Sequence, residues 1–360
     1  MDNTELLLKE LTEAFGPSGF EEAVRKIMNK QLSKYTNNIY TDGLGSLIAE
    51  LHGERTNPKV MVTAHMDEVG LLVKYVNDQG YIKFQQLGGW IDQALLGQRW
   101  QILTKKGIVF GISGIKTPHT MKPEERRKII PSDDIFIDVG ALSKEDAEKR
   151  LGIHPGDPIA PLSEFKLLGN KGLYVSKAWD DRIGLAVMTQ MAKALYNSSH
   201  PNKLFLVSTV QEEIGLRGAQ TSSFYIKPDI GINIESGVSG DYPGISQDES
   251  QEKIGSGPTI FLHDSSMIPN IKLRNLVIAI AKKMKINIQF NVLKGYGQDG
   301  SAIQKTHIGT PTINIAVPTR YLHSHNGVIS RLDFDNTVKL VTDLIKHLDM
   351  KTINSLKSFD

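Results

Sequence analysis

The apolar and polar positions at the start of the chain predict two helices followed by a buried strand. Apolar residues recur at helical spacing up to Phe15, residues 16–19 (GPSG) interrupt the pattern, and residues 20–32 resume it. Residues 59–63 (KVMVT) form a short apolar run, which is typical of a buried strand. We expect this strand to run into a loop that carries His65 and Asp67.

The pattern changes between about residue 70 and residue 160. Short β-rich pieces alternate with Gly and Pro turns there, and only one short helix is expected, at residues 143–150. The segment 116–131 is a long, polar and charged loop. Repeated short strands favour a small β-barrel or sandwich over further α/β layers. The expected strands cover residues 71–76, 81–84, 100–103, 108–112 and 135–138.

From residue 172 onwards, strands and helices alternate. This alternation predicts an α/β domain with a mostly parallel or mixed sheet and helices on both of its faces. Ser330 and Asp333 have the spacing of a capping box at the start of the last helix. We expect one α/β domain, residues 1–70 and 165–360, interrupted by an inserted β-rich domain at 71–164. The expected helices are 183–195, 271–284 and 332–348, and the strands are 204–210, 230–234, 286–292 and 312–317.

The charge balance and the lack of Cys exclude several kinds of partner and site. The 360 residues contain 42 Lys and Arg against 40 Asp and Glu, and this balance argues against a strongly basic nucleic-acid binder. The basic cluster 122–128 (KPEERRK) includes two Glu and no aromatic residue, so we expect no nucleic-acid partner. The chain has no Cys, which excludes disulfides, thiolate zinc sites and a cysteine nucleophile. Any metal must therefore be bound by His and carboxylates.

The N-terminal residues do not have the pattern of a targeting segment. Their apolar run, residues 6–8, is short and flanked by charges, unlike a signal peptide. Nor does any stretch of the sequence approach the ~20 apolar residues of a membrane span. We therefore expect a cytoplasmic protein without a membrane partner.

Titratable residues follow five segments of the predicted α/β domain. Ligands of open α/β sheets bind beyond the carboxyl ends of the strands, so these residues are candidates for one site. Their nitrogen and oxygen donors suit Zn²⁺, Co²⁺ or Mn²⁺. Each piece also has a plain structural interpretation, such as a helix cap or a solvated acidic face. The candidates are His65, Asp67, Asp180, Asp181, Glu212, Glu213, Glu235, His323 and His325.

Local spacing suggests how two of these pairs would work. His65 and Asp67 share a face of an extended chain, so the Asp67 carboxylate can accept the ring N–H of His65 while the other ring nitrogen binds metal. Glu212 and Glu213 point in opposite directions in a regular strand. Both reach one site only if the chain has already left the strand, and one could then bind metal while the other acts as a base.

Four motifs occur along the chain: residues 64–70 (AHMDEVG), 177–182 (KAWDDR), 211–219 (QEEIGLRGA) and 318–325 (PTRYLHSH). In this order they resemble the signatures of the tetrahedral (TET) aminopeptidases, a two-metal family that includes glutamyl and deblocking aminopeptidases and some proteins called endoglucanase-like. The resemblance runs from about residue 15 to residue 348. It extends into the inserted segment at residues 87–90 (LGGW), 97–99 (GQR) and 152–157 (GIHPGD).

The resemblance implies a role for each candidate. Two divalent ions per subunit, Zn²⁺, Co²⁺ or Mn²⁺, would share the carboxylate of Asp180. One ion would also bind His65 and Glu235, and the other would also bind Glu213 and His323. Glu212 would be the general base that takes a proton from a metal-bridging water, and Asp67 would orient His65.

The sequence departs from the family pattern at two places. Glu235 stands where the family usually has Asp, and residues 294–300 (KGYGQDG) replace a Gly-Gly-Thr-Asp run that many relatives carry. Asp299 still matches the family's aspartate near the substrate amine. Arg320, in the last motif, is a further candidate for substrate binding.

The implied fold is a zinc-aminopeptidase-like α/β/α catalytic domain with a mixed sheet and an inserted small β-barrel. The implied activity is the metal-dependent removal of N-terminal residues from peptides. The family's self-assembly implies homodimers formed through the inserted domain, and then a tetrahedral homododecamer. Two alternatives are a metal-independent glycoside hydrolase, which a chelator would not inhibit, and an oligomeric scaffold with a decayed site.

Overall fold

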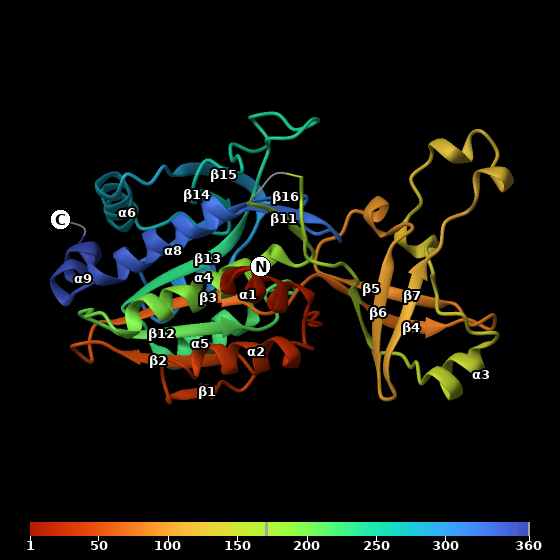
Figure 1. The fold of residues 1–360 in the computed structure, drawn as a ribbon, viewed down its shortest axis with the longest axis horizontal. Helices are drawn as coiled ribbons and strands as arrows, with labels where there is room; N and C mark the ends of the chain where they lie inside the picture. Colours follow the sequence, from red (N-terminus) through yellow and green to blue (C-terminus); the bar gives the residue numbers. More distant parts are fainter. Residues whose placement is uncertain (170–171, 359–360) are drawn as a thin grey trace.

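A mixed sheet of eleven strands forms the centre of the larger part of the chain (Figure 1). The computed structural model describes residues 1–169 and 172–358. The main path of the sheet is β1-β2-β12-β3-β13-β16-β17-β11-β10, and β14 pairs with β15 and β16. The strands are β1 (Ile39–Thr41), β2 (Leu47–His52), β3 (Lys59–His65), β10 (Lys166–Leu167), β11 (Leu173–Ser176), β12 (Lys203–Thr209), β13 (Ile230–Val238), β14 (Thr259–Ser265), β15 (Gln289–Tyr296), β16 (Thr312–Arg320) and β17 (Gly327–Ser330).

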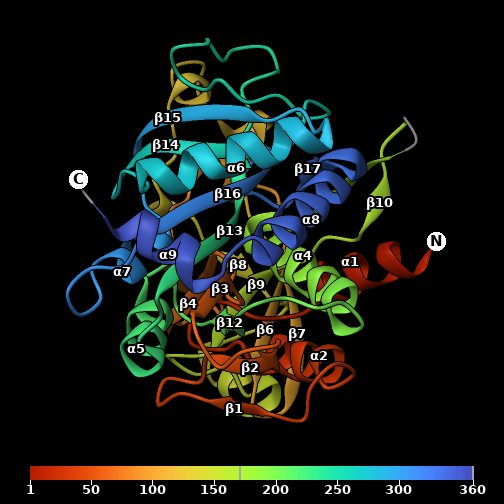
Figure 2. The same cartoon turned by 90° about the vertical axis from the view of Figure 1, so that its left-hand side faces the viewer.

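Helices cover both faces of this sheet. Successive residues of a strand point to opposite faces, so Val60 and Val62 pack into the larger core while Met61 packs into a smaller core with α5 and α7. Figure 2 shows α5 and α7 on one side of the stacked strands and α4 and α8 on the other. The helices are α1 (Asn3–Glu13), α2 (Glu22–Leu32), α4 (Trp179–Tyr196), α5 (Arg217–Ile226), α6 (Ile271–Met284), α7 (Asp299–Gln304), α8 (Arg331–Lys346) and α9 (Met350–Lys357).

A closed six-stranded barrel lies beside the sheet, at the right of Figure 1. It has its own apolar core around Trp100 and Ile102, separate from the core under the sheet. A short helix, α3 (Lys144–Asp146), and a π-helical turn at Ala147–Leu151 pack on it. The barrel strands are β4 (Gly70–Val76), β5 (Ile82–Leu87), β6 (Arg99–Thr104), β7 (Gly107–Ser113), β8 (Ile137–Asp138) and β9 (Pro158–Pro161). The mixed α/β fold with a small barrel is confirmed.

The parallel strands at the centre of the sheet bring the candidate residues together. β12 and β13 both run parallel to β3, and β16 runs parallel to β13, so the carboxyl ends of all four meet at one edge. Asn233 of β13 is level with Thr63 of β3. Glu235, two residues further on, therefore lies level with His65.

Three local expectations need correction. The strand expected at 230–234 continues to Val238, so Glu235 lies inside β13 rather than beyond it. The helix expected from residue 183 begins at Trp179, with non-helical backbone at Asp180 and Asp181. The capping box is wrong, because Ser330 makes no side-chain cap bond.

The carboxylate of Asp333 is used elsewhere. It accepts the backbone N–H groups of Gly255 and Gly257 at 2.5 and 2.7 Å. The spacing of Asp333 from Ser330 is that of a capping box, but the N–H groups that Asp333 binds belong to a turn distant in the sequence. Among the described residues, no helix is both long and apolar enough to cross a membrane.

Candidate metal centre

His65 is the last residue of β3, and its buried ring faces four carboxylates. Its Nε2 lies 2.8 Å from Asp180 Oδ1 and 3.4 Å from Glu235 Oε1. Its Nδ1 lies 2.9 Å from the backbone carbonyl of Asp67 and 3.5 Å from the carboxylate of that residue. A carbonyl oxygen only accepts, so Nδ1 carries a proton, and Nε2 is the ring nitrogen that faces the carboxylates and could bind a metal ion. The expected partner residue is thus correct, but its carbonyl makes the closer contact.

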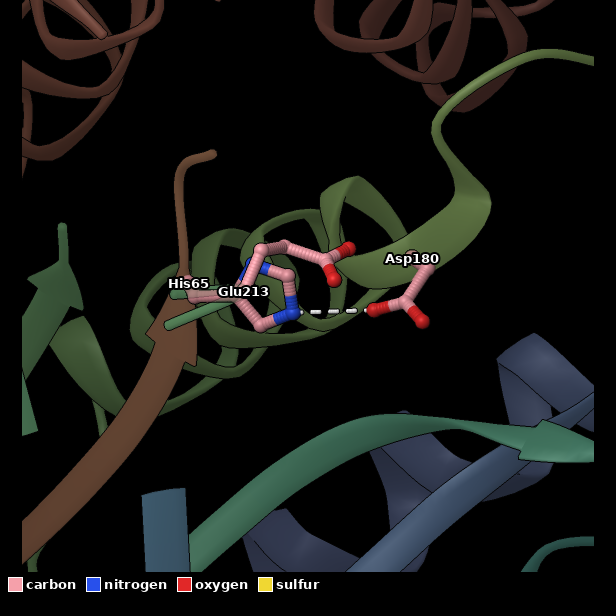
Figure 3. A group of neighbouring side chains, drawn as sticks. All are labelled: His65, Asp180 and Glu213. Atoms are coloured by element: carbon pink, nitrogen blue, oxygen red, sulfur yellow. Dashed lines mark hydrogen bonds and ion pairs between the residues drawn. The ribbon is translucent and has the colours of Figure 1, made fainter. Parts of the chain in front are cut away.

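Asp180 lies between two histidines. Its Oδ1 faces His65, and its Oδ2 lies 3.3 Å from Nε2 of His323. Figure 3 shows the His65 ring and the Glu213 carboxylate beside Asp180. Burial alone would raise the pKa of Asp180, but its hydrogen bonds to His323 and His65 outweigh burial and hold the pKa far below its ordinary value. One carboxylate thus contacts two separate nitrogen donors.

Glu213 and His323 form the other side of the cluster. His323 Nε2 lies 3.5 Å from Glu213 Oε1, and His323 Nδ1 donates to the carbonyl of Gly89 at 2.7 Å. Glu213 Oε1 is buried and has no hydrogen-bond partner among the described residues. Burial raises the pKa of Glu213 to about 7. A buried carboxylate oxygen without a donor is the position that a cation would satisfy.

Glu212 and Glu235 add two more buried carboxylates. Glu212 lies 3.9 Å from Nε2 of His65, and burial raises its pKa well above the ordinary value. Burial also raises the pKa of Glu235, to about 8. Several buried carboxylates can be ionised together only if cations compensate their negative charge. The nitrogen and oxygen donors of this site therefore fit divalent metal ions.

Two groups of donor atoms lie close enough to hold an ion. One consists of His65, Asp180 and Glu213, and the other of His65, Asp181 and Glu235, with ligand atoms within 4.8 Å of one another. The carboxylate of Asp181 already accepts the backbone N–H groups of His65 and Gly184, at 3.1 and 3.0 Å. The sequence left Asp181 either as a site candidate or as a helix cap, and its bond to Gly184 is of the capping kind.

The Asp67 carboxylate holds the loop after β12. It accepts the backbone N–H groups of Glu212 and Glu213, at 3.0 and 3.1 Å, and the hydroxyl of Ser18 at 2.6 Å. These bonds explain how two consecutive glutamates reach one site, because the chain has left the strand at Thr209. Ser18 was not expected in the site, since its segment has only the pattern of a helix break.

The remaining candidates lie around this centre. Asp299 accepts a hydrogen bond from Thr209 at 2.5 Å, its Oδ1 has no partner in the described part of the chain, and burial raises its pKa to about 6. Arg320, at the end of β16, forms a two-bond ion pair with Asp241 at 2.7 and 2.6 Å.

His325 lies apart from the other histidines. Its Nε2 donates to the carbonyl of Arg99 at 3.0 Å, and its ring packs edge-on against Trp100, 4.5 Å away. Burial lowers the pKa of His325 to about 4, so the ring is neutral. This histidine connects the loop after β16 to the barrel.

Comparison with known proteins gives a consistent result. A sequence model described as M42 glutamyl aminopeptidase matches residues 45–340, and a model described as AMPT matches residues 2–28. The lysyl aminopeptidase of Pyrococcus furiosus is 33% identical over 351 residues, which is 95% of this chain and 96% of that protein.

Two solved structures are also similar over nearly the whole chain. A TET aminopeptidase from a marine sediment archaeon of the Thaumarchaeota is 41% identical, with a TM-score of 0.96 over 99% of both chains. The TET1 peptidase of Pyrococcus horikoshii is 33% identical, with a TM-score of 0.87 over 96% of this chain and 100% of that one. The chain therefore belongs to the M42 glutamyl aminopeptidase family and is a metal-dependent aminopeptidase.

Proposed function

We propose that the chain removes single N-terminal residues from peptides at a centre that holds two divalent ions, Zn²⁺, Co²⁺ or Mn²⁺. The observation that carries this proposal is the position of Asp180, whose two oxygens face His65 and His323 separately. In the proposed arrangement Asp180 would be a ligand of both ions. Glu235 would complete the site of His65, and Glu213 would complete the site of His323.

Asp180 is a better shared ligand than its neighbour Asp181. The oxygens of Asp181 are bound by two backbone N–H groups, which fix its carboxylate between β3 and the start of α4. The hydrogen bonds of Asp180, by contrast, go to the two histidine rings. We infer that Asp181 holds the backbone of His65 in place.

Glu212 is the proposed general base. Two divalent ions at such a centre would lower the pKa of water towards neutrality and polarise the scissile carbonyl. Glu212 lies next to His65, and Asp67 fixes its backbone. Because burial raises the pKa of Glu212, its carboxylate can take a proton from the attacking water and hold it until the leaving amine accepts it.

Two further residues are proposed to bind the substrate. Asp299 offers a buried carboxylate, one oxygen of which has no hydrogen-bond partner among the described residues, and this suits the free ammonium group of a peptide N-terminus. Arg320 is proposed to contact the substrate with a guanidinium that Asp241 orients.

We also propose the domain division 1–70 with 165–360 as the catalytic domain and 71–164 as a dimerisation domain. Residues on the outer face of β7 support it: Ile108, Phe110 and Ile112 are 41, 65 and 56% exposed, which is unusual for a barrel that meets only solvent. The Pyrococcus horikoshii TET1 peptidase can assemble into a tetrahedron or a large octahedral shell. A tetrahedral homododecamer is therefore proposed for this chain.

The cytoplasmic location and the lack of a nucleic-acid partner stay predictions.

A panel of aminoacyl-nitroanilides would test the activity. The protein is assayed untreated, after chelation, and after each divalent metal is added back. We expect cleavage that the chelator abolishes and Zn²⁺, Co²⁺ or Mn²⁺ restores. Chelator-resistant activity, cleavage of N-terminally blocked peptides or cleavage of glucans would contradict the proposal. The scaffold alternative predicts no cleavage in any arm.

A further inference from the structure

The loop that carries Glu212 and Glu213 is held by two buried carboxylates, and one of them comes from the N-terminal segment. Asp67 binds the backbone N–H groups of Glu212 and Glu213. The residue before them, Gln211, donates its backbone N–H to Glu21 Oε1 at 3.1 Å. Three consecutive N–H groups of this loop are thus bound by side chains from two distant segments.

Gln211 has a backbone that needs such support. Its φ is +56°, in the left-handed region that residues with a side chain seldom adopt. The rotation of the chain at Gln211 sets the direction in which Glu212 leaves the sheet. A shift at this residue would therefore move the carboxylate of Glu212 relative to His65.

The side chain of Glu21 binds the backbone of Gln211 and does not cap its own helix. It occupies the N-cap position of α2 but makes no side-chain cap bond there. Its Oε1 also accepts the backbone N–H of Gly19 at 2.7 Å, and the residue is 2% exposed. Burial and the nearby charge of Asp67 raise the pKa of Glu21. A second buried carboxylate beside Asp67 is unfavourable for folding in itself.

The segment around Glu21 is fixed to the same edge of the sheet. Pro17 forms an isolated parallel bridge with Glu68, and the backbone N–H of Glu68 donates to the carbonyl of Gly16 at 3.0 Å. Ser18 donates to the carboxylate of Asp67. Residues 16–21 therefore form a brace between the end of β3 and the loop after β12.

We propose that Glu21 is a positioning residue that sets the orientation of Glu212 through the backbone of Gln211. This inference rests on the proposed role of Glu212 as general base. The acceptor geometry of Glu21 is what matters, so an isosteric amide that still offers an oxygen to Gln211 keeps most of the function.

The variants Glu21→Ala, Glu21→Gln and Glu22→Ala separate this role from a structural one. Glu22 is the matched control, since it is the exposed neighbour and forms an ion pair with Lys26 across one turn. We expect Glu21→Ala to lower kcat about 10- to 100-fold with KM and metal content changed less than about 2-fold. Glu21→Gln should recover kcat to within about 5-fold of wild type, and Glu22→Ala should match wild type.

The variant Glu212→Gln tests the base separately. If Glu212→Gln keeps full turnover, the proposed role of Glu212 as base fails. If Glu212→Gln is inactive while Glu21→Ala keeps wild-type kcat, only the positioning role of Glu21 fails. Combining Glu21→Ala with Glu212→Gln should lower kcat no further than Glu212→Gln alone, because one residue acts through the other. Additive losses would overturn the inference.

The variant Glu21→Asp provides a second test if Glu21→Ala does not fold. Glu21→Asp keeps the charge but withdraws the oxygen from Gln211 by about 1.5 Å, the length of one C–C bond. We expect a folded enzyme with kcat lowered to a similar degree. Wild-type kcat in Glu21→Asp would contradict the positioning role.

Discussion

The carboxylate of Asp67 accepts the backbone N–H of Glu212 at 3.0 Å, across 145 positions of the sequence. Its carbonyl meanwhile accepts the ring N–H of His65. One residue thereby sets the position of the proposed base and the ring orientation of a proposed metal ligand.

We therefore expect Asp67→Asn to impair turnover as well as stability. An amide offers one acceptor oxygen where the carboxylate offers two, so at least one N–H of the loop loses its partner. We expect kcat to fall about 10- to 100-fold. The free energy of unfolding should fall by about 1–3 kcal/mol. Steady-state kinetics and urea unfolding measure the two effects.

Asp333→Asn is the matched control for this change. Asp333 is also buried and also binds two backbone N–H groups, of Gly255 and Gly257, in a turn that carries none of the proposed ligands. It should lose stability to a similar extent and keep its kcat. An equal loss of kcat in both variants would show that Asp67 acts only through stability.

The two adjacent glutamates should respond differently to the same substitution. We expect Glu212→Gln to retain bound metal and to lower kcat about 10²- to 10⁴-fold, since a general base is lost. Glu213→Gln should lower the metal content per subunit, because the orphaned oxygen of Glu213 faces His323. Atomic absorption on the purified proteins measures the difference. Full turnover in Glu212→Gln would rule out its role as base.

Metal binding should release protons. In the metal-free centre, burial raises the pKa of Glu213 to about 7 and of Glu235 to about 8. Burial lowers the pKa of His323, but the charges of Glu213 and Asp180 raise it to about 10. All three groups must lose their protons to bind metal.

Because these three pKa values are raised, metal affinity should fall as the pH falls. The folded, metal-free protein holds protons at pH 7, so each step down in pH makes their removal more costly and weakens metal affinity. We expect affinity to fall steadily between pH 8 and pH 6. Titration calorimetry in two buffers of different ionisation enthalpy counts the protons. Equal heats in both buffers would contradict the prediction.

Local patterns predicted several central strands and helices of the α/β domain and marked the strand ends as places for titratable residues. The ends of buried parallel strands are recognisable from apolar runs, and their carboxyl ends meet at one edge whatever the loops do. His65 was expected just beyond its strand, and it is in fact the last residue of β3. Glu235 was expected beyond its strand, because the apolar run stops at Ile234, whereas pairing with β16 continues the strand to Val238.

Residues that act across long sequence separations were not predictable in this way. Ser18 and Asp67 are 49 positions apart, and Glu21 and Gln211 are 190 apart. Their segment, with Gly16 and Pro17, has the composition of a helix break, and nothing in its spacing identifies a partner. Tertiary packing decides such contacts, and a glutamate at the start of a helix resembles an ordinary cap.

Lys177 and Glu68 are a similar hidden pair, and they offer a test of stability. Lys177 Nζ donates to both oxygens of Glu68 at 2.6 Å, and each side chain is 1% exposed. Burial lowers the pKa of Lys177 to about 8, although the charge of Glu68 opposes this shift. Glu68 follows Asp67, and Lys177 lies three residues before Asp180, so the pair ties two site-bearing segments together.

Lys177→Met should destabilise the protein by about 3–5 kcal/mol, because, among the residues that the structure describes, it leaves the buried Glu68 carboxylate with only Arg182, 3.5 Å away, as a charged partner. Glu68→Gln in the same chain removes the stranded charge. The double variant should therefore be more stable than Lys177→Met alone, which chemical denaturation of the metal-loaded protein measures. Losses that simply add would show that the two side chains contribute independently. A double variant that regains stability but not kcat would mean that the pair also sets the distance between the segments of Asp67 and Asp180.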